Sequence, residues 1–303
     1  MKLGFVTAIL PDQSLEEVLR IASEIGYDCV EVMCWPPGKA ERRYAGVTHI
    51  DITSLTASTI KEIKDLCSSY NVEISALGYY PNPLTPDLIA RQKYTEHLKA
   101  LIRAAARLDI SVVNTFIGRD QHKTVEDNWQ DFMQVWTEII GQADAFGVKV
   151  GIENCPMKFT KDEWPGGQNL FTTPAIWEKA WRHLPSPNFG LNYDPSHMVI
   201  QHMDTSLPIK SYSSRLHHVH AKDATIDRDE VNRHGIFAHP NLWHTPKIPG
   251  RGDVDWQAFF HALKEVNYTG AVCVEVEDRA YEGPLEDRIR ALRDSHDFLR
   301  KLI

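Results

Sequence analysis

Short apolar runs alternate with amphipathic stretches along the whole chain. Each run rich in β-branched residues predicts a strand, and the stretch after it repeats its apolar residues at helical spacing. The predicted strands cover residues 3–9, 28–34, 72–79, 111–117, 148–154, 189–194, 216–222 and 270–277. The predicted helices cover residues 14–26, 56–70, 86–108, 124–146, 173–183, 206–214, 255–266 and 285–302. Eight such strand and helix units predict an α/β protein, with a parallel sheet closed into a single (β/α)8 TIM barrel.

The first predicted helix has clear signals at both ends. Ser14 precedes its apolar pattern, Glu17 follows three residues later and Gly26 lies at the far end, as in a capping box and a glycine C-cap. Two connections, 35–55 and 223–254, are longer than barrel loops usually are. We expect loops of that length on the C-terminal face to be functional.

The composition is that of an ordinary globular protein. The chain has 303 residues, of which 43% are hydrophobic and 24% charged, and we expect one TIM-barrel domain over residues 1–303. The net charge is −8 and no dense Lys/Arg run occurs, which argues against a nucleic-acid partner. No run approaches the roughly 20 apolar residues of a membrane span, so no membrane partner is expected.

Other features bear on the compartment and on cofactors. The five cysteines form no CxxC pair, which is typical of reduced, buried thiols. Together with an N-terminus unlike a signal peptide, they predict a cytoplasmic protein. Neither GxGxxG nor GxxxxGK[ST] occurs, so no nucleotide or dinucleotide cofactor is expected. The oligomeric state is open, a homo-oligomer included.

Side chains of the kinds that bind metals end four successive predicted strands in the second half of the chain. They are Glu153 in VKVGIEN, Asp194 in FGLNYD, His220 in LHHVH and Glu275 in AVCVEVE. One such residue alone is more often a solvated, capping or hydrogen-bonded side chain, but four in corresponding places are a rare coincidence. Barrel enzymes place their chemistry at the carboxyl ends of the strands. The set therefore predicts a divalent-metal site on the C-terminal face.

Alternation along the strands predicts the direction in which these side chains point. Successive strand residues face opposite sides of a sheet, and small residues suit the crowded barrel axis. The predicted inward sets are Ala271, Cys273 and Glu275 in one strand, Asn192 and Asp194 in another, and His218, His220 and Lys222 in a third.

Five motifs make the chain resemble a known family. They are GIEN around Glu153, NYDPSH around Asp194 and His197, HVHAKD around His220, PGRGDVDW at 249–256 and VCVEVE around Glu275. Over essentially its whole length the chain is similar to the xylose-isomerase-like barrels. These include sugar isomerases, ketose 3-epimerases, inosose isomerases and dehydratases, and abasic-site endonucleases. The resemblance implies that Glu153, Asp194, His220 and Glu275 hold one divalent ion, Mn²⁺ first, with Co²⁺, Mg²⁺ or Zn²⁺ as alternatives.

The resemblance also implies a metal-dependent isomerase or epimerase that acts on a small sugar, keto-sugar or polyol. Removing a proton next to a carbonyl needs a metal to stabilise the enediolate and two carboxylates that act in turn as base and acid. Glu153 and Glu275 are the expected catalytic pair. His197 is expected to contact the substrate or join the metal shell, and the other expected substrate contacts are Lys222, Arg251, Glu163 and Trp164.

Other activities stay open at the level of sequence. The same ion and carboxylates would support β-elimination or hydration, so a lyase or dehydratase acting on a keto-sugar, inosose or 3-keto-glycoside is the nearest alternative. A trinuclear abasic-site endonuclease fits less well, because the early strand ends carry Trp35, Tyr79 and Thr115 instead of histidines. Asn232 and His234 also stand where such enzymes have an acidic pair. A sugar-binding barrel without activity is the remaining alternative.

Overall fold

The computed structural model describes residues 1–38, 45–158 and 166–303. The barrel strands are β1 (Lys2–Val6), β2 (Cys29–Met33), β3 (Glu73–Gly78), β4 (Val112–Thr115), β5 (Lys149–Glu153), β6 (Phe189–Tyr193), β7 (Leu216–Ala221) and β10 (Ala271–Val274). They pair in parallel around a closed barrel in the order β1, β10, β7, β6, β5, β4, β3, β2. The predicted (β/α)8 barrel is confirmed.

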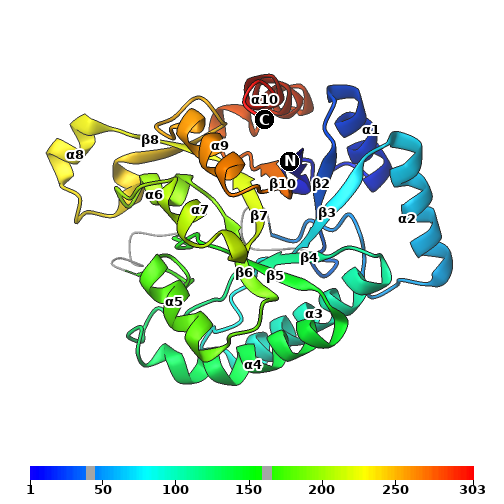
Figure 1. Cartoon of the computed structure of the whole chain (residues 1–303), viewed down its shortest axis with the longest axis horizontal. Coiled ribbons are helices and arrows are strands. Elements are labelled where there is room, and N and C mark those ends of the chain that lie inside the picture. Colours follow the sequence, from blue (N-terminus) through cyan, green and yellow to red (C-terminus); the bar gives the residue numbers. More distant parts are fainter. Residues whose placement is uncertain (39–44, 159–165) are drawn as a thin grey trace.

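Helices surround the barrel between these strands (Figure 1). They are α1 (Leu15–Ile25), α2 (Ala57–Tyr70), α3 (Leu88–Arg107), α4 (Asn128–Phe146), α5 (Pro174–His183), α6 (Ser196–Val199), α7 (Leu207–Ser211), α9 (Trp256–Glu265) and α10 (Leu285–Leu299). The helix predicted over 206–214 is shorter than expected, because α7 gives way to a 3-10 turn (Ser213–Arg215). The short helix α6 was not predicted.

The helix ends follow the capping signals of the sequence. In α1, the Ser14 hydroxyl accepts from the Glu17 N–H at 3.2 Å, the Glu17 carboxylate accepts from the Ser14 N–H at 2.7 Å, and Gly26 closes the helix with a φ of +100°. Helix α4 begins at Asn128, not at the predicted Thr124. The Thr124 hydroxyl instead accepts from the Asp127 N–H at 3.1 Å, so Thr124 and Asp127 form a turn before the helix.

The strands present two different faces, as their alternation predicts. Val272 and Val274 are fully buried in the main core between sheet and helices, whereas Ala271 and Cys273 belong to a separate buried cluster that includes Cys29 of β2. The inward positions of several other strands are polar and buried, namely Glu31, Asn114, Asn192, His218 and His220. The barrel axis is therefore partly hydrophilic, and many of its polar groups form hydrogen bonds with one another.

The connection after β7 contains structure that the sequence prediction missed. Instead of a plain loop, residues 223–247 form a hairpin of β8 (Asp223–Ile226) and β9 (His244–Lys247), with α8 (Arg228–His234) between them. Helix α8 extends outward from the barrel in Figure 1.

Asp223 fastens the base of this hairpin to the PGRGDVDW segment. Its carboxylate accepts from Gly250 N–H at 3.0 Å, from Val254 N–H at 3.0 Å and from Trp256 Nε1–H at 2.8 Å. Asp223 is fully buried. The glycines of this segment therefore shape a turn that is bound to the barrel through one carboxylate.

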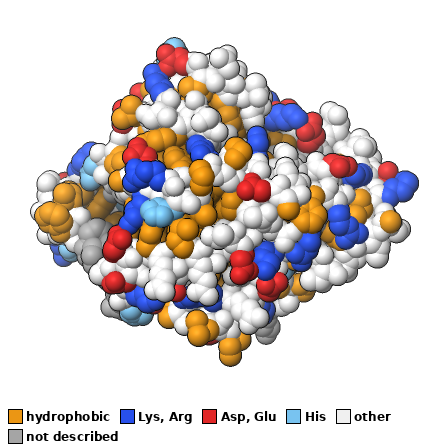
Figure 2. All heavy atoms as spheres, turned by 60° about the horizontal axis from the view of Figure 1, so that its bottom comes forward, with side chains coloured by type: hydrophobic (Ala, Val, Ile, Leu, Met, Phe, Trp, Pro, Cys, Tyr) orange, Lys and Arg blue, Asp and Glu red, His pale blue; other side chains and the backbone are white. Residues whose placement is uncertain are grey.

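The surface carries charges of both signs. On the face shown in Figure 2, acidic and basic side chains lie interspersed. Exposed ion pairs elsewhere described on the surface include Arg20 with Glu24 and Lys210 with Glu265. Among the described helices, none combines the length and the apolar character needed to cross a membrane.

Candidate metal centre and active site

The four predicted metal ligands converge at one end of the barrel. Glu153 is the last residue of β5, Asp194 directly follows β6, His220 lies next to the end of β7, and Glu275 directly follows β10. Their ligand atoms all lie within 4.8 Å of one another. Glu153, Asp194 and His220 are at most 2% exposed, and Glu275 is half-buried. We call these four residues the ligand cluster.

Two buried asparagines fix the backbone that carries the cluster. The Asn154 amide donates to the Asp194 carbonyl at 2.9 Å, and its Oδ1 accepts from the Asp194 N–H at 2.8 Å. The Asn169 amide donates to the carbonyls of Glu153 at 2.9 Å and Cys155 at 2.6 Å. These bonds join the ends of β5 and β6 to each other and to the following loop, which gives the carboxylates a rigid base.

The Lys222 ammonium lies among the carboxylates. Its Nζ is 2.6 Å from Glu275 Oε2, 3.0 Å from Asp194 Oδ2 and Glu277 Oε2, and 3.7 Å from Glu153 Oε1. Burial favours neutral carboxyl groups, but the charge of Lys222 and the neighbouring histidines together outweigh burial and lower the pKa of Glu153 and of Glu275. Burial likewise opposes the charge on Lys222, and the surrounding carboxylates outweigh it and raise the lysine pKa. The protein thus stabilises a cation at this point.

Two buried atoms of the ligand cluster have no hydrogen-bond partner among the described residues. His220 Nδ1 faces Glu275 Oε2 at 3.6 Å and Glu153 Oε1 at 3.9 Å, and Asp194 Oδ2 makes ion-pair contacts only. Buried polar atoms are normally hydrogen-bonded, so lone pairs left in this way fit a bound cation. Three carboxylates and one imidazole are donors that suit Mn²⁺, Mg²⁺, Co²⁺ or Zn²⁺. The residues present therefore fit a divalent ion.

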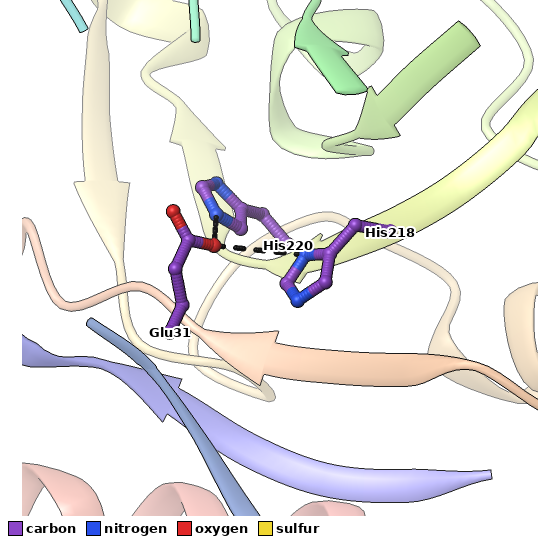
Figure 3. Close-up of side chains that lie close together, drawn as sticks. All are labelled: Glu31, His218 and His220. Atoms are coloured by element: carbon purple, nitrogen blue, oxygen red, sulfur yellow. Dashed lines mark hydrogen bonds and ion pairs between the residues drawn. The ribbon is translucent and has the colours of Figure 1, made fainter. Parts of the chain in front are cut away.

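Glu31, on β2, orients His220 from inside the barrel. Its Oε2 lies 2.8 Å from His220 Nε2 and 3.6 Å from His218 Nδ1 (Figure 3). Burial alone would raise the pKa of Glu31, but the two histidines and a hydrogen bond from Tyr80 outweigh burial and lower it. An ionised carboxylate only accepts, so His220 Nε2 donates, and Nδ1 is the nitrogen that faces the ligand cluster, where it can offer a lone pair to an ion. Carboxylates commonly hold metal-binding histidines in this way.

Further side chains complete this inner network. The Asn114 amide donates to Glu31 Oε2 at 2.9 Å, and the Tyr80 hydroxyl donates to Glu31 Oε1. Asn192 donates to the Tyr80 hydroxyl at 3.1 Å, and its Oδ1 contacts His218 Nδ1 at 3.1 Å. Sequence reasoning missed Glu31. The available signal was a single acidic residue between two valines in the apolar strand CVEVM.

His197 lies beside the ligand cluster on α6. Its Nε2 is 3.1 Å from Glu153 Oε1 and 3.3 Å from Asp194 Oδ2. Cys155, two residues after Glu153, is half-buried, and burial raises its thiol pKa. The ligand atoms of Glu153, Cys155 and His197 also lie within 4.8 Å of one another. His197 is thus placed where a contact with the metal shell or the substrate requires it.

A cavity of about 580 Å³ adjoins the cluster, a size suited to a small molecule. Its polar lining includes Glu153, His197, Lys222, Glu275, Glu277 and His244, and its aromatic lining includes Trp35, Tyr80 and Phe116. An apolar and aromatic wall with a few convergent polar groups is the usual form of a small-molecule site.

Other predicted residues lie elsewhere. The Arg251 side chain is 62% exposed, lies 3.9 Å from Asp294 of α10 and does not line the cavity. The glycine-rich turn directs it to the outer surface, so the structure does not bring it together with the ligand cluster. Glu163 and Trp164 lie outside the described residues. Asn232 and His234 lie on α8, where His234 Nε2 is 3.0 Å from Glu230 Oε2.

Comparison with known proteins agrees with this architecture. Residues 19–302 match a family model described as the xylose isomerase-like TIM barrel. The chain belongs to this family. The uncharacterized protein YfiH of Bacillus subtilis (strain 168) is 24% identical and the match covers 97% of this chain and 99% of YfiH. An inosose dehydratase of Clostridium perfringens is 36% identical in a match that covers 33% of this chain and 35% of the dehydratase.

Solved structures of this family share the fold. The structure of D-psicose 3-epimerase with D-tagatose from Clostridium cellulolyticum H10 has a TM-score of 0.69 at 17% identity, and covers 100% of this chain and 99% of the epimerase. A structure of IolI protein with a bound zinc atom has a TM-score of 0.68 at 19% identity, with coverage of 100% and 99%. At these identities the likeness establishes the common fold. The resemblance inferred from the motifs is confirmed at the level of the family.

Proposed function

We propose that this protein is a divalent-metal-dependent isomerase or epimerase of a small sugar or keto-sugar. The observation that carries the proposal is the ligand cluster itself. Four side chains from four separate strand ends meet within 4.8 Å beside a cavity, and His220 Nδ1 and Asp194 Oδ2 are buried without hydrogen bonds. Glu153, Asp194, His220 and Glu275 would hold the ion. When bound, it would stabilise negative charge on a substrate oxygen.

Mn²⁺ is the ion that we propose first. Three of the four ligand side chains offer oxygen, and oxygen donors favour hard ions such as Mn²⁺ and Mg²⁺, while the imidazole also suits Zn²⁺ and Co²⁺. The structure of IolI protein with a bound zinc atom keeps Zn²⁺ among the ions to be tested.

Glu153 and Glu275 are the proposed proton-transfer pair. Strands β5 and β10 are separated in the barrel by β6 and β7, so the two carboxylates approach the cavity from different directions. Both line the cavity, and their lowered pKa values keep them ionised. In the proposed reaction one carboxylate removes the proton from the carbon next to the carbonyl, and the other delivers a proton at the neighbouring or opposite position.

Lys222 and His197 are the proposed substrate contacts. Lys222 Nζ already pairs with carboxylates at the cavity wall, so it can bind a substrate oxygen that carries negative charge. His197 lines the same wall. The aromatic side chains opposite offer apolar faces to the carbon skeleton of a sugar.

A dehydratase acting on a keto-sugar or inosose is the second candidate. The observation that favours it is the buried Lys222 ammonium next to Glu275, because an ammonium at the cavity wall can donate a hydrogen bond to a leaving hydroxyl group. The inosose dehydratase that matches one third of this chain supports keeping this reaction in the test.

A single experiment separates the two reactions. The full chain would be incubated with Mn²⁺ in D2O with a panel of ketohexoses and inososes, and the products followed by NMR. Isomerisation predicts deuterium next to the carbonyl together with an isomeric product. Loss of water from the substrate would establish the dehydratase instead, and binding without exchange or product would contradict both.

A further inference from the structure

Beside the ligand cluster lies a second group of potential ligands with a different chemistry. Glu153, Cys155 and His197 offer one oxygen, one sulfur and one nitrogen, all within 4.8 Å of one another. Glu153 belongs to both groups. His197 Nε2 lies 3.1 Å from Glu153 Oε1, which places the imidazole on the Cys155 side of the shared carboxylate.

The backbone holds these three side chains in position. Asn169 donates to the carbonyl oxygens of both Glu153 and Cys155, and the Gln201 amide donates to the His197 carbonyl at 2.8 Å. The Cys155 sulfur accepts from the Met157 N–H at 3.3 Å. Fixed ligands that converge before binding are what a metal site requires.

A buried oxygen of the ligand cluster lies at the same place. Asp194 is fully buried, and within the described parts of the chain its Oδ2 makes ion-pair contacts but no hydrogen bond, with Lys222 Nζ at 3.0 Å. That oxygen lies 3.3 Å from His197 Nε2. A cation held by Glu153, Cys155 and His197 would therefore have a fourth oxygen within reach, which completes the four donors of a tetrahedral site.

The charges of the site accommodate a second ion. Four carboxylates, those of Glu153, Asp194, Glu275 and Glu277, contact Lys222. These four negative charges exceed the positive charges of Lys222 and one divalent ion together. Metal binding displaces the thiol proton, because the thiolate is the form that coordinates.

We propose that Glu153, Cys155 and His197 form a second metal site, selective for thiophilic divalent ions such as Zn²⁺ and Co²⁺, with Glu153 as the bridge to the ligand cluster. Soft sulfur ligands favour these ions over Mn²⁺ and Mg²⁺. Two ions bridged in this way would lie about 3.5–4 Å apart, as in other two-metal centres. The proposal shares Glu153, Asp194 and His197 with the proposed function but does not depend on the sugar reaction.

Cobalt titration of the metal-free full chain tests this site. The spectrum reports thiolate ligation through a near-ultraviolet charge-transfer band, while elemental analysis counts the bound ions. We expect two cobalt ions per chain, and we expect the charge-transfer band to appear on addition of the second equivalent of cobalt. Cys155→Ser should lose the band and the second ion and keep the first. Cys67→Ser is the matched control, since Cys67 is a half-buried thiol on α2, and it should retain both.

Each other outcome has a defined meaning. Binding of one ion without the band would overturn the second site and leave the ligand cluster intact. A band that arrives with the first equivalent would overturn it as well, because the sulfur would then belong to the first ion. A band that survives Cys155→Ser would assign the thiolate to another residue. Metal selectivity gives a further check, since Mn²⁺ should fill one site only.

Discussion

Glu31 Oε2 and His220 Nε2 lie 2.8 Å apart and join β2 to β7 across the interior of the barrel. Both residues are completely buried, and the two strands are not neighbours in the sheet. The bond fixes the orientation of the His220 imidazole, so that Nδ1 faces the ligand cluster. A residue outside the cavity lining thereby orients a proposed metal ligand.

Replacement of Glu31 should weaken metal binding. In Glu31→Gln an amide replaces the carboxylate that faces His220 Nε2. Because an amide can donate as well as accept, it no longer fixes the imidazole with Nδ1 available to bind an ion. We expect the Mn²⁺ affinity to fall by roughly 10–100-fold, measured by calorimetry on the full chain. Glu73→Gln is the control, because Glu73 is an exposed residue at the start of β3. Circular dichroism would verify that the variant folds, and unchanged affinity in a folded variant would refute the positioning role.

Each glutamate of the proposed proton-transfer pair should be essential. Glu153→Gln and Glu275→Gln keep the size of the side chain and remove its ability to exchange a proton, so turnover should fall by roughly 10²–10⁴-fold while the fold persists. Turnover is followed by product formation from the substrate identified in the panel. Glu265→Gln, an exposed position on α9, should behave as wild type. Near-normal turnover in both Glu153→Gln and Glu275→Gln would exclude the proposed proton-transfer role of these two glutamates.

Lys222 should compete with the metal. Lys222→Met removes the cation that offsets several buried carboxylates, so the metal-free protein should lose about 3–5 kcal/mol of unfolding free energy. Because the ion then meets no competing ammonium, Mn²⁺ should stabilise the variant more than wild type. Thermal unfolding with and without Mn²⁺ measures both effects. Equal stabilisation of the two proteins by Mn²⁺ would contradict the competition.

A matched variant separates this effect from a general loss of surface charge. Lys64→Met removes an exposed lysine that pairs with Asp109 on the outside of the barrel. Surface substitutions of this kind usually change stability by no more than about 0.5 kcal/mol. Its response to Mn²⁺ should equal that of wild type.

His217 should make the fold sensitive to acid. Burial, with the positive charges of Lys149 and Arg215, lowers its pKa to about 3. The pKa of a histidine in the unfolded chain is about 6.5. At pH values between these two pKa values, His217 therefore binds a proton in the unfolded chain but not in the folded chain. Stability should fall as the pH falls from about 6.5 toward 3, and His217 alone should account for about 2 kcal/mol of the loss between pH 7 and pH 5. Urea unfolding of wild type and His217→Gln at both pH values measures this share, and identical pH dependence would refute it.

The barrel was predictable because its signals are local. Strand and helix periodicity, the capping box of Ser14 and Glu17, and the ligands at the strand ends all lie in short stretches of sequence, and closure of the barrel brings strand ends together. The inward orientation of Asp194, His220 and Glu275 could be predicted from the two-residue period of a strand alone.

The unpredicted parts depend on contacts between distant segments. Strand β8 has four residues and pairs with β9 some twenty positions later, so no local period identifies it. Glu31 meets His220 only after the barrel has closed. The Lys222 ammonium was placed on the correct face by alternation, but its position among four carboxylates depends on the length of its side chain and on the charges that converge there.

The most direct test of the account is the anomalous X-ray signal of crystals grown with Mn²⁺. The account predicts one strong peak bounded by Glu153, Asp194, Glu275 and His220 Nδ1, at about 2.0–2.3 Å from the ligand atoms, with Lys222 displaced toward the cavity. A peak elsewhere, or Lys222 retained among the carboxylates with no peak beside it at saturating Mn²⁺, would contradict the central claim that these residues form a divalent-metal centre.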